Sequence, residues 1–277
     1  MISRRFKSRL RYYARIFQLN TALIMSETSA KSAWQNKDQS HYAGIEELWA
    51  IESQLKNYNQ DIALKISLDF KSGDNVLEFG GGIGSIATII QAKKKITPDC
   101  VELDPDLRSI LKERGFNSCA SVEQLNKRYD HVYLSNVLEH IEDDVSVLKQ
   151  IHSALKEDGK VVIYSPAFQI LYTSFDAQVG HYRRYSLSDL QRKLIQANFS
   201  ILRYEYVDSL GFLAWMLLKL NNVFKVSKTD SSGAKGHNSF AIYDKFVYPI
   251  SRIMDKLGFR YFLGKNILVV AQKNTVD

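Results

Sequence analysis

Four glycines follow an acidic residue in the segment VLEFGGGIGSIA, from Val76 to Ala87. The acid is Glu78 and the glycines are Gly80, Gly81, Gly82 and Gly84. Glycines at the junction of a strand and a helix let the backbone turn tightly and approach a nucleotide closely. A dinucleotide-binding fingerprint needs a third glycine where this chain has Ser85, so the pattern argues against that class. The acid before the glycines favours a ligand with a positively charged amino-acid end.

A second pair of acids follows about twenty residues further on, in the sequence Val101-Glu102-Leu103-Asp104-Pro105. A carboxylate at the carboxyl tip of the second strand can accept hydrogen bonds from both hydroxyls of a ribose. Either Glu102 or Asp104 could do this, and we expect Glu102. Asp104 is then placed to cap the next helix, with Pro105 at its first position.

Two histidines and a basic loop could act on a second substrate. His181 lies in the sequence GHYRRY (residues 180–185) and is the better candidate for a general base. His140 is the second candidate, or packs beside the ligand of the glycine segment. Arg183 and Arg184 either bind a phosphate or carboxylate of the second substrate, called the acceptor below, or form salt bridges to the helix that follows. Tyr182 completes the expected acceptor-binding residues of this loop.

These residues need strands and helices to position them, and the apolar pattern predicts alternating strands and helices from about residue 75 onward. The predicted strands are Asn75–Phe79, Pro98–Leu103, Ser118–Ala120, His131–Ser135, Lys160–Ser165, Ser200–Asp208 and Asn266–Gln272. This alternation is typical of βαβ units and a parallel sheet. Helical periodicity is also present in residues 41–66, and a helix is expected to begin at Ser186, with Asp189 at the spacing of a capping box.

A helical insertion of more than fifty residues separates the last two predicted strands, over residues 209–264. We expect one helix over Leu210–Phe224, a loop over Val226–Ser239 and a second helix over Phe240–Leu257. The first helix is apolar almost all round, so it either packs as a lid over the acceptor site or lies on lipid. Trp215 on this helix is the expected acceptor contact.

The formal net charge of +7 is concentrated at the start of the chain. The first 17 residues contain six arginine or lysine side chains and no acid, which leaves about +1 for the remainder. A nucleic-acid-binding domain would carry its basic charge within the fold, so nucleic acid is not an expected partner. Residues 1–20 have the pattern of a basic amphipathic helix that contacts an anionic membrane, although a solvated terminus fits equally well and an organelle transit peptide fits less well.

Two further compositional features bound the function. No apolar run reaches the roughly 20 residues of a membrane span. Cys100 and Cys119 have neither the spacing of a metal site nor that of a disulfide framework, which fits a reducing compartment.

The glycine segment, the acids after the second strand and the sequence SNVLEHIEDDVSVLKQIHSALKEDGKVVIYSP (residues 135–166) together resemble class I S-adenosylmethionine-dependent methyltransferases. The resemblance implies S-adenosylmethionine as cofactor and a Rossmann-like, seven-stranded, mostly parallel sheet. Its last strand would be antiparallel, with helices on both faces. Residues 41–277 would form the methyltransferase domain after an arm and linker over 1–40, and residues 41–70 would be helices over the cofactor.

The same resemblance assigns cofactor contacts residue by residue. Glu78 would lie near the methionine ammonium group, Glu102 and Leu103 near the ribose and its surroundings, and Asn136 near the methionine part. Ser121 and Val122 would lie beside the adenine. An Asp normally occupies the position of Ser121, so a weaker adenine contact is implied. Tyr58, in the sequence NYN, is also expected to contact the cofactor.

A narrower resemblance concerns the acceptor. The sequences NYN, DAQVGHYRRYSLSDL and YVDSLGFLAWMLLKLNN are similar to a bacterial subgroup associated with sugar transferases of surface-polysaccharide pathways. This implies methyl transfer to a hydroxyl of a glycan, a glycolipid or another small metabolite in the cytoplasm, or at the inner face of the membrane. RNA or protein methylation and a catalytically silent, cofactor-binding partner module are the alternatives.

Two related signatures are incomplete in this chain. Some O-methyltransferases bind a divalent cation at the sequence E-x-x-E-H, but this chain has Asn136 in place of the first acid, before Glu139 and His140, so no metal is expected. Methyltransferases of base amino groups use an Asn/Asp-Pro-Pro-aromatic loop, whereas this chain reads Ser135-Asn136-Val137-Leu138. That difference argues against a base amino group as acceptor.

Overall fold

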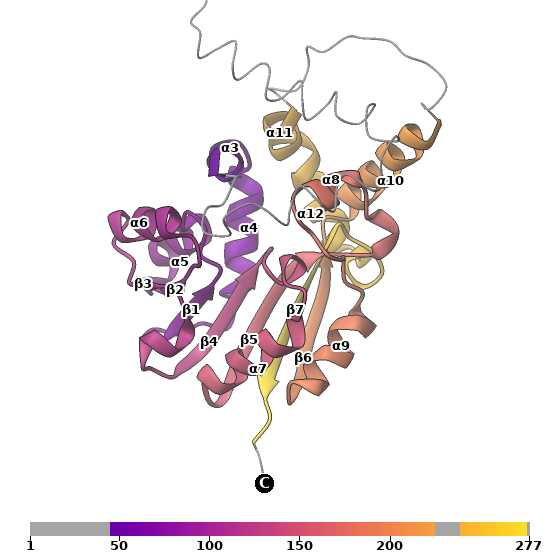
Figure 1. Cartoon of the computed structure of the whole chain (residues 1–277). Helices are drawn as coiled ribbons and strands as arrows, with labels where there is room; N and C mark the ends of the chain where they lie inside the picture. Colours follow the sequence, from indigo (N-terminus) through magenta and orange to yellow (C-terminus); the bar gives the residue numbers. More distant parts are fainter. Residues whose placement is uncertain (1–44, 225–238, 276–277) are drawn as a thin grey trace, which may run out of the picture.

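The computed structural model describes residues 45–224 and 239–275 (Figure 1). The predicted basic arm and linker lie outside these ranges, as does the loop predicted over Val226–Ser239 except its last residue, Ser239, which begins a helix. The strands in chain order are β1 (Val76–Phe79), β2 (Asp99–Val101), β3 (Ser118–Cys119), β4 (Tyr129–Ser135), β5 (Leu155–Pro166), β6 (Phe199–Val207) and β7 (Asn266–Lys273).

The strands form one sheet in the order β3-β2-β1-β4-β5-β7-β6. Strands β3, β2, β1, β4 and β5 pair in parallel, whereas β7 pairs antiparallel with both β5 and β6. The prediction of a Rossmann-like, seven-stranded sheet with an antiparallel last strand is therefore confirmed. The largest difference in strand bounds is at β5, which begins at Leu155 rather than Lys160 because Leu155 pairs with Tyr129 across a register shift.

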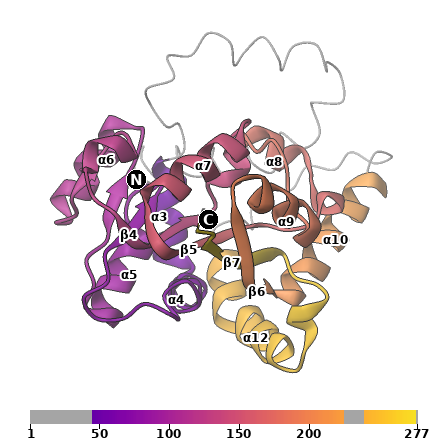
Figure 2. The same cartoon turned by 90° about the horizontal axis from the view of Figure 1, so that it is seen from below.

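Helices cover both faces of the sheet (Figure 2). In chain order they are α3 (Ile45–Gln54), α4 (Lys56–Ile66), α5 (Ser85–Lys94), α6 (Pro105–Glu113), α7 (Asp144–Ala154), α8 (Ser174–Gln178), α9 (Leu187–Gln196), α10 (Ser209–Phe224), α11 (Ser239–Ile242) and α12 (Tyr248–Lys256). Helices α7 and α9 pack on one face, and α4 and α5 pack on the other. Each face buries its own apolar core, which fixes the sheet as a central layer.

Sequence signals for the helix starts agree with the structure at two places. The side chain of Ser186 accepts a hydrogen bond from the backbone N–H of Asp189, and the capping box predicted for α9 is present. Asp104 caps α6 as predicted, because its side chain accepts from the N–H groups of Asp106 and Leu107, with Pro105 at the first helical position.

The insertion between β6 and β7 is helical in its described residues, as predicted, but its second helix is not uniform. A π-helical turn, η5 (Tyr243–Val247), separates α11 from α12, and a short 3-10 helix, η6 (Phe259–Tyr261), precedes β7. Such π turns mark local irregularity in an otherwise α-helical segment. None of the helices in the described ranges has the length and apolar character required to cross a membrane.

Candidate active site at the carboxyl edge of the sheet

The glycine segment forms a tight turn between β1 and α5. Gly80, Gly82 and Gly84 all have positive φ angles, of 79°, 53° and 80°. A Cβ atom on Gly80 would lie 2.5 Å from Cγ2 of Val137, so the turn packs directly against the loop after β4. A Cβ on Gly82 would meet only Leu48, at 3.6 Å, which leaves its backbone open for approach by a ligand.

Glu78 is a buried carboxyl group at the base of this turn. It is 3% exposed, and burial raises its pKa well above the usual range. A buried carboxyl group without a full positive charge beside it favours its neutral form, and a cation stabilises its ionised form. The position therefore suits a ligand that brings its own positive charge.

Glu102 and Leu103 follow β2, beside the glycine turn. The carboxylate of Glu102 accepts hydrogen bonds from the N–H of Gly82 at 2.8 Å and of Asp104 at 3.0 Å. These bonds hold the carboxylate at the mouth of the turn while leaving acceptor capacity for two hydroxyl groups. Leu103 is 78% exposed and offers an apolar surface next to this carboxylate.

Ser121 and Val122 follow β3, the strand next to β2, so they reach the same end of the sheet. Ser121 precedes the short helix η1 (Val122–Leu125), and both residues are partly exposed. Asn136 follows β4 with a positive φ of 54°, and its N–H donates to the carbonyl of Tyr164. A buried acid, an open glycine turn and a second carboxylate fit a ligand with an ammonium group and a ribose.

Tyr58, which is expected to contact the cofactor, has its hydroxyl bonded to two strands of the sheet. Tyr58 is buried, and its hydroxyl is 2.9 Å from that of Tyr164 on β5 and accepts a hydrogen bond from Asn266 on β7 at 2.8 Å. The structure therefore uses this hydroxyl to join α4 to the other half of the sheet.

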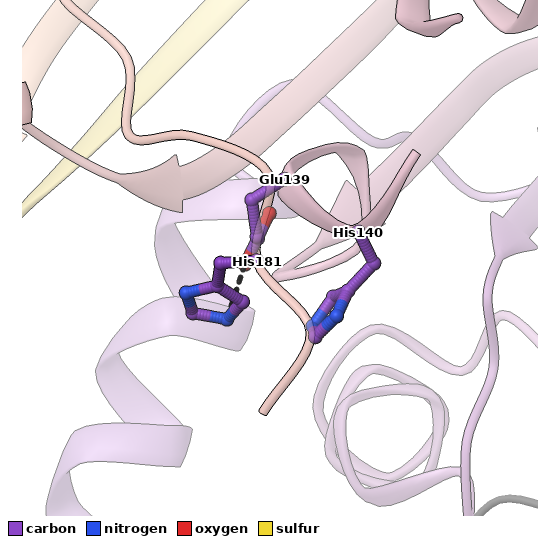
Figure 3. Close-up of side chains that lie close together, drawn as sticks. All are labelled: Glu139, His140 and His181. Atoms are coloured by element: carbon purple, nitrogen blue, oxygen red, sulfur yellow. Dashed lines mark ion pairs between the residues drawn. The ribbon is translucent and has the colours of Figure 1, made fainter. Parts of the chain in front are cut away.

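The two candidate bases, His140 and His181, lie together with Glu139, which in the sequence stands out only as part of an incomplete metal-binding signature. Figure 3 shows Glu139 and His140, from the 3-10 helix η2 (Leu138–His140) after β4, beside His181 from the loop after α8. The His140 and His181 rings are 4.6 Å apart in an edge-to-face arrangement. Nε2 of His181 is 4.0 Å from Oε1 of Glu139. We call these three residues the acceptor cluster.

Burial shapes the charges of this cluster. Glu139 is fully buried, neither of its oxygens has a hydrogen-bond partner among the described residues, and burial raises its pKa to about 7 despite the nearby His181. Burial, together with the charge of His181, lowers the pKa of His140 to about 4, so this ring is neutral at pH 7. One atom from each of the three residues lies within 4.8 Å of the others, an arrangement that could also hold a divalent cation.

Asp176 orients His181. Its Oδ1 lies 2.8 Å from Nδ1 of His181, which assigns the proton to Nδ1 and leaves Nε2 facing the cluster. The same carboxylate accepts from Nε and Nη2 of Arg184 at 2.8 and 3.1 Å and from the N–H of Thr173. Hydrogen bonds from His181 and Arg184 lower the pKa of Asp176, although its burial works against them.

Two predicted acceptor contacts need correction. Arg184 is only 6% exposed and donates from Nε and Nη2 to Asp176, so it supports the loop, while its buried Nη1 has no hydrogen-bond partner among the described residues. Arg183 donates to Asp144 at 2.6 Å, at the start of α7, and the hydroxyl of Tyr185 lies 2.8 Å from the same carboxylate. The salt-bridge alternative is therefore closer to the structure, but the partners are Asp176 and Asp144, not the helix that follows.

The other two predicted acceptor contacts lie on this loop and on the insertion helix that packs against it. The ring of Tyr182 is 53% exposed, and its backbone N–H donates to the carbonyl of Glu139. Trp215 on α10 donates from Nε1 to the carbonyl of Leu171 at 3.0 Å, and its ring lies beneath the guanidinium of Arg184 at 5.3 Å. The insertion thus packs against the loop that carries His181.

Three acidic residues matter more in the structure than the sequence motifs indicate. Asp144 and Asp176 lie in the segments that carry the family resemblance, but no role is predicted for them, and Glu139 is considered only in the incomplete metal signature. The one local signal is the adjacency of Glu139 and His140 in the sequence LEHIEDD. Asp144 lies 39 residues from Arg183, so pairing between them could not be inferred from spacing.

Comparison with known proteins agrees with this geometry. A family model described as a methyltransferase domain matches residues 51–204, more than half of the chain. Phosphoethanolamine N-methyltransferase 2 from Caenorhabditis elegans is 24% identical over 209 residues, which cover 69% of this chain. The chain spans 45% of the length of that curated relative.

Solved structures show the same fold. A SAM-dependent methyltransferase from Archaeoglobus fulgidus aligns with a TM-score of 0.54 at 19% identity, over 82% of this chain and 99% of that one. Phosphoethanolamine N-methyltransferase 2 from Haemonchus contortus, solved in complex with S-adenosyl-L-methionine, aligns with a TM-score of 0.55 at 18% identity. That alignment covers 88% of this chain and 60% of the other.

Proposed function

Since the chain belongs to the methyltransferase-domain family and uses S-adenosylmethionine, we propose that it methylates a hydroxyl oxygen of an acceptor held at the acceptor cluster. The observation that carries the proposal is the Asp176–His181 pair beside the buried Glu139, at the same edge of the sheet as the glycine turn. A hydroxyl must lose a proton when it is methylated, and this cluster offers groups that accept one.

On the donor side, the proposal assigns the glycine turn to the methionine part of the cofactor and Glu78 to its ammonium group. Glu102 holds the ribose hydroxyls, Leu103 and Val122 flank the adenine with Ser121, and Asn136 lines the methionine part. When bound, S-adenosylmethionine supplies an electrophilic methyl group on a sulfonium. The chain contributes the alignment of that group with the acceptor, which by proximity and orientation provides much of the rate increase.

On the acceptor side, His181 is the proposed base. Asp176 accepts the Nδ1 proton and fixes the ring, so Nε2 can take the proton of the acceptor hydroxyl. Glu139, 4.0 Å from Nε2, stabilises the imidazolium that forms. His140 stays neutral and bounds the site beside His181, and Tyr182 and Trp215 bound the acceptor from the loop and the insertion. Residues 209–264 are the proposed acceptor lid.

A second acceptor class follows from the Caenorhabditis elegans relative, whose name specifies N-methylation of phosphoethanolamine. A phosphorylated acceptor needs a cationic group to hold its phosphate. The two arginines of the loop are already paired, Arg183 with Asp144 and Arg184 with Asp176. This pairing favours a neutral hydroxyl acceptor over a phosphorylated amine.

The similarity of residues 176–190 and of the start of the insertion to the sugar-transferase-associated subgroup supports a glycan, a glycolipid or another small hydroxyl metabolite as acceptor. We place the reaction in the cytoplasm, with lipid-linked glycans at the inner face of the membrane as the main candidates. RNA, protein and a catalytically silent role remain the competing functions.

An acceptor screen with isotopically labelled S-adenosylmethionine tests the proposal. The panel contains lipid-linked oligosaccharides, free sugars, phosphoethanolamine, RNA and a protein extract, and each is tested with the wild type and with His181→Asn. We expect label in a sugar-containing acceptor with the wild type only. Label in phosphoethanolamine, at a rate unaffected by His181→Asn, would reject both the hydroxyl acceptor and the base.

A further inference from the structure

The helical segment from α11 to α12 turns its two acidic side chains inward. Asp244 accepts hydrogen bonds from the backbone N–H groups of Asn57 and Tyr58, at the start of α4. Asp255 accepts from the N–H groups of Asp208 and Ser209, at the start of α10. Both carboxylates therefore cap the positive ends of neighbouring helices, which explains why the buried face of this segment is acidic.

The outward face of the same segment is apolar. Its exposed residues recur three or four positions apart, as one side of a helix does. They are Ile242, Phe246, Ile250, Ile253 and Leu257, and their exposed fractions run from 54% to 76%. We call these five residues the apolar stripe. Phe259, Tyr261 and Phe262 extend it with exposed fractions of 41%, 51% and 75%.

The exposed charges beside the stripe have one sign. Residues 239–262 contain two acids, Asp244 and Asp255, which are 5% and 4% exposed because they serve as caps. Of the basic residues of the segment, Lys245 and Lys256 are exposed, and Arg252 and Arg260 are partly exposed. Arg252 and Arg260 also lie within ion-pair distance of Asp61 and Glu205 on neighbouring elements, whereas no ion pair within the described ranges involves Lys245 or Lys256.

We propose that the apolar stripe and its basic neighbours dock the protein onto an anionic lipid surface. An apolar helix face flanked by lysine and arginine is the pattern of a helix that lies in the membrane interface, with the apolar side chains among the acyl chains and the cations at the headgroups. A second copy of this chain is a poorer partner, because a symmetric contact through the same face would bring like charges together.

Docking at this face has a consequence for the active site. The two capped helices begin at the carboxyl edge of the sheet, where Val207 ends β6 and Asn266 begins β7. Figure 2 shows α12 at the rim of the molecule, on the same side of the sheet as α4. A lipid surface at α12 would lie at the carboxyl edge of the sheet, on the face opposite the one that carries α8 (Figure 2). The docking does not depend on which acceptor is methylated.

Vesicle flotation of the full chain tests the docking. Vesicles of phosphatidylcholine alone are compared with vesicles that contain about one third phosphatidylglycerol, and the variant carries Phe246→Ser, Ile250→Ser and Ile253→Ser. We expect the wild type to float only with the anionic vesicles and the variant to lose at least fivefold in bound fraction. Lys245→Glu with Lys256→Glu should lower binding to anionic vesicles in the same way.

A matched control removes exposed apolar residues elsewhere: Leu68→Ser, Ile195→Ser and Leu202→Ser, whose exposed fractions are 61%, 63% and 50%. This variant should float like the wild type. Circular dichroism and affinity for S-adenosylmethionine check that both triple variants fold. Flotation of the stripe variant at the wild-type level would overturn the proposal, because another segment, such as residues 1–20, would then carry the binding. A stripe variant that changes only the oligomeric state would assign the face to a second copy instead.

Discussion

The proposed donor and acceptor sides of the candidate active site are built in different ways. The proposed donor side consists mainly of the glycine turn and the tip of β2, within the 27 residues from Glu78 to Asp104, and adds Ser121, Val122 and Asn136 from the ends of β3 and β4. The acceptor side uses side chains from separate segments, with His181 fixed by Asp176 and the loop tied to Asp144 on α7. Because the two sides use different residues, binding of the methyl donor and removal of the acceptor proton should respond separately to mutation.

The substitution His181→Asn is expected to have the largest effect on turnover while leaving cofactor affinity unchanged. Loss of a general base costs about 10²- to 10⁴-fold in turnover. The affinity for S-adenosylmethionine should stay near the wild-type value, because His181 lies outside the glycine turn. Initial rates with the acceptor found in the screen, together with calorimetry of cofactor binding, measure both quantities. A parallel loss of cofactor affinity would break the distinction between the two sides.

The substitution Gly80→Ala is expected to lower the affinity for the cofactor instead. A side chain at this φ costs ~1–2 kcal/mol, and the added Cβ would also clash with Val137. Such a clash in a packed site costs ~1–3 kcal/mol, and relieving it displaces the turn from its binding geometry; if the whole cost falls on the bound form, cofactor affinity drops by about 30-fold or more. Gly73→Ala is the matched control, because Gly73 has a φ of 91° and an added Cβ would meet no atom within 4 Å. Equal cofactor affinity of the two variants would show that the contact with Val137 is unimportant.

Asp176→Asn tests whether the orientation of His181 matters apart from its presence. Loss of a charge-assisted hydrogen bond costs ~1.5–3 kcal/mol, equivalent to about 10- to 100-fold in rate if the bond acts in the transition state. We expect kcat to fall while cofactor affinity and the acceptor KM change little. Asp189→Asn, on the exposed capping box of α9, should leave kcat unchanged. A fall in thermal stability with kcat intact would make Asp176 a structural residue only.

Glu102→Gln tests whether Glu102, rather than Asp104, binds the ribose of the cofactor. The amide keeps the shape of the carboxylate but loses its charge, so we expect a loss of ~1–2 kcal/mol in cofactor binding. Asp104→Ala should instead lower the free energy of unfolding by ~1 kcal/mol through loss of the α6 cap. Calorimetry and thermal melting separate the two effects. The reverse result would assign the ribose to Asp104.

The smallest expected effect on turnover is that of removing divalent metal ions. Because His181 is proposed to act directly as the base, treatment with a chelator should leave turnover unchanged. Loss of turnover on chelation, with recovery on addition of Mn²⁺ or Zn²⁺, would assign Glu139, His140 and His181 to a cation instead.

The same difference explains what sequence reasoning could predict. The glycine turn, the Asp104 cap and the capping box of α9 depend on residues close in sequence, and the structure has all three features where they were predicted. The pairing of Arg183 with Asp144 and the burial of Glu139 depend on how η2, α7 and the loop after α8 pack together. No local pattern encodes that packing, so neither the partner of Arg184 nor the bonds of the Tyr58 hydroxyl could be predicted from sequence position alone.

The insertion is a second case in which the sequence predicts an element but not its orientation. Its helices were predicted, but the periodicity of residues 240–257 does not say which face is buried. An apolar face would ordinarily pack inward. Here the need to cap α4 and α10 brings the acidic face inward.

The central claim is that the methyl group goes to oxygen. Transfer from S-adenosylmethionine carrying a ¹³C-labelled methyl group, followed by nuclear magnetic resonance of the purified product, tests it most directly. We expect a labelled carbon bonded to oxygen in a sugar-containing product, formed by the wild type and not by His181→Asn. A labelled carbon bonded to nitrogen would contradict the claim.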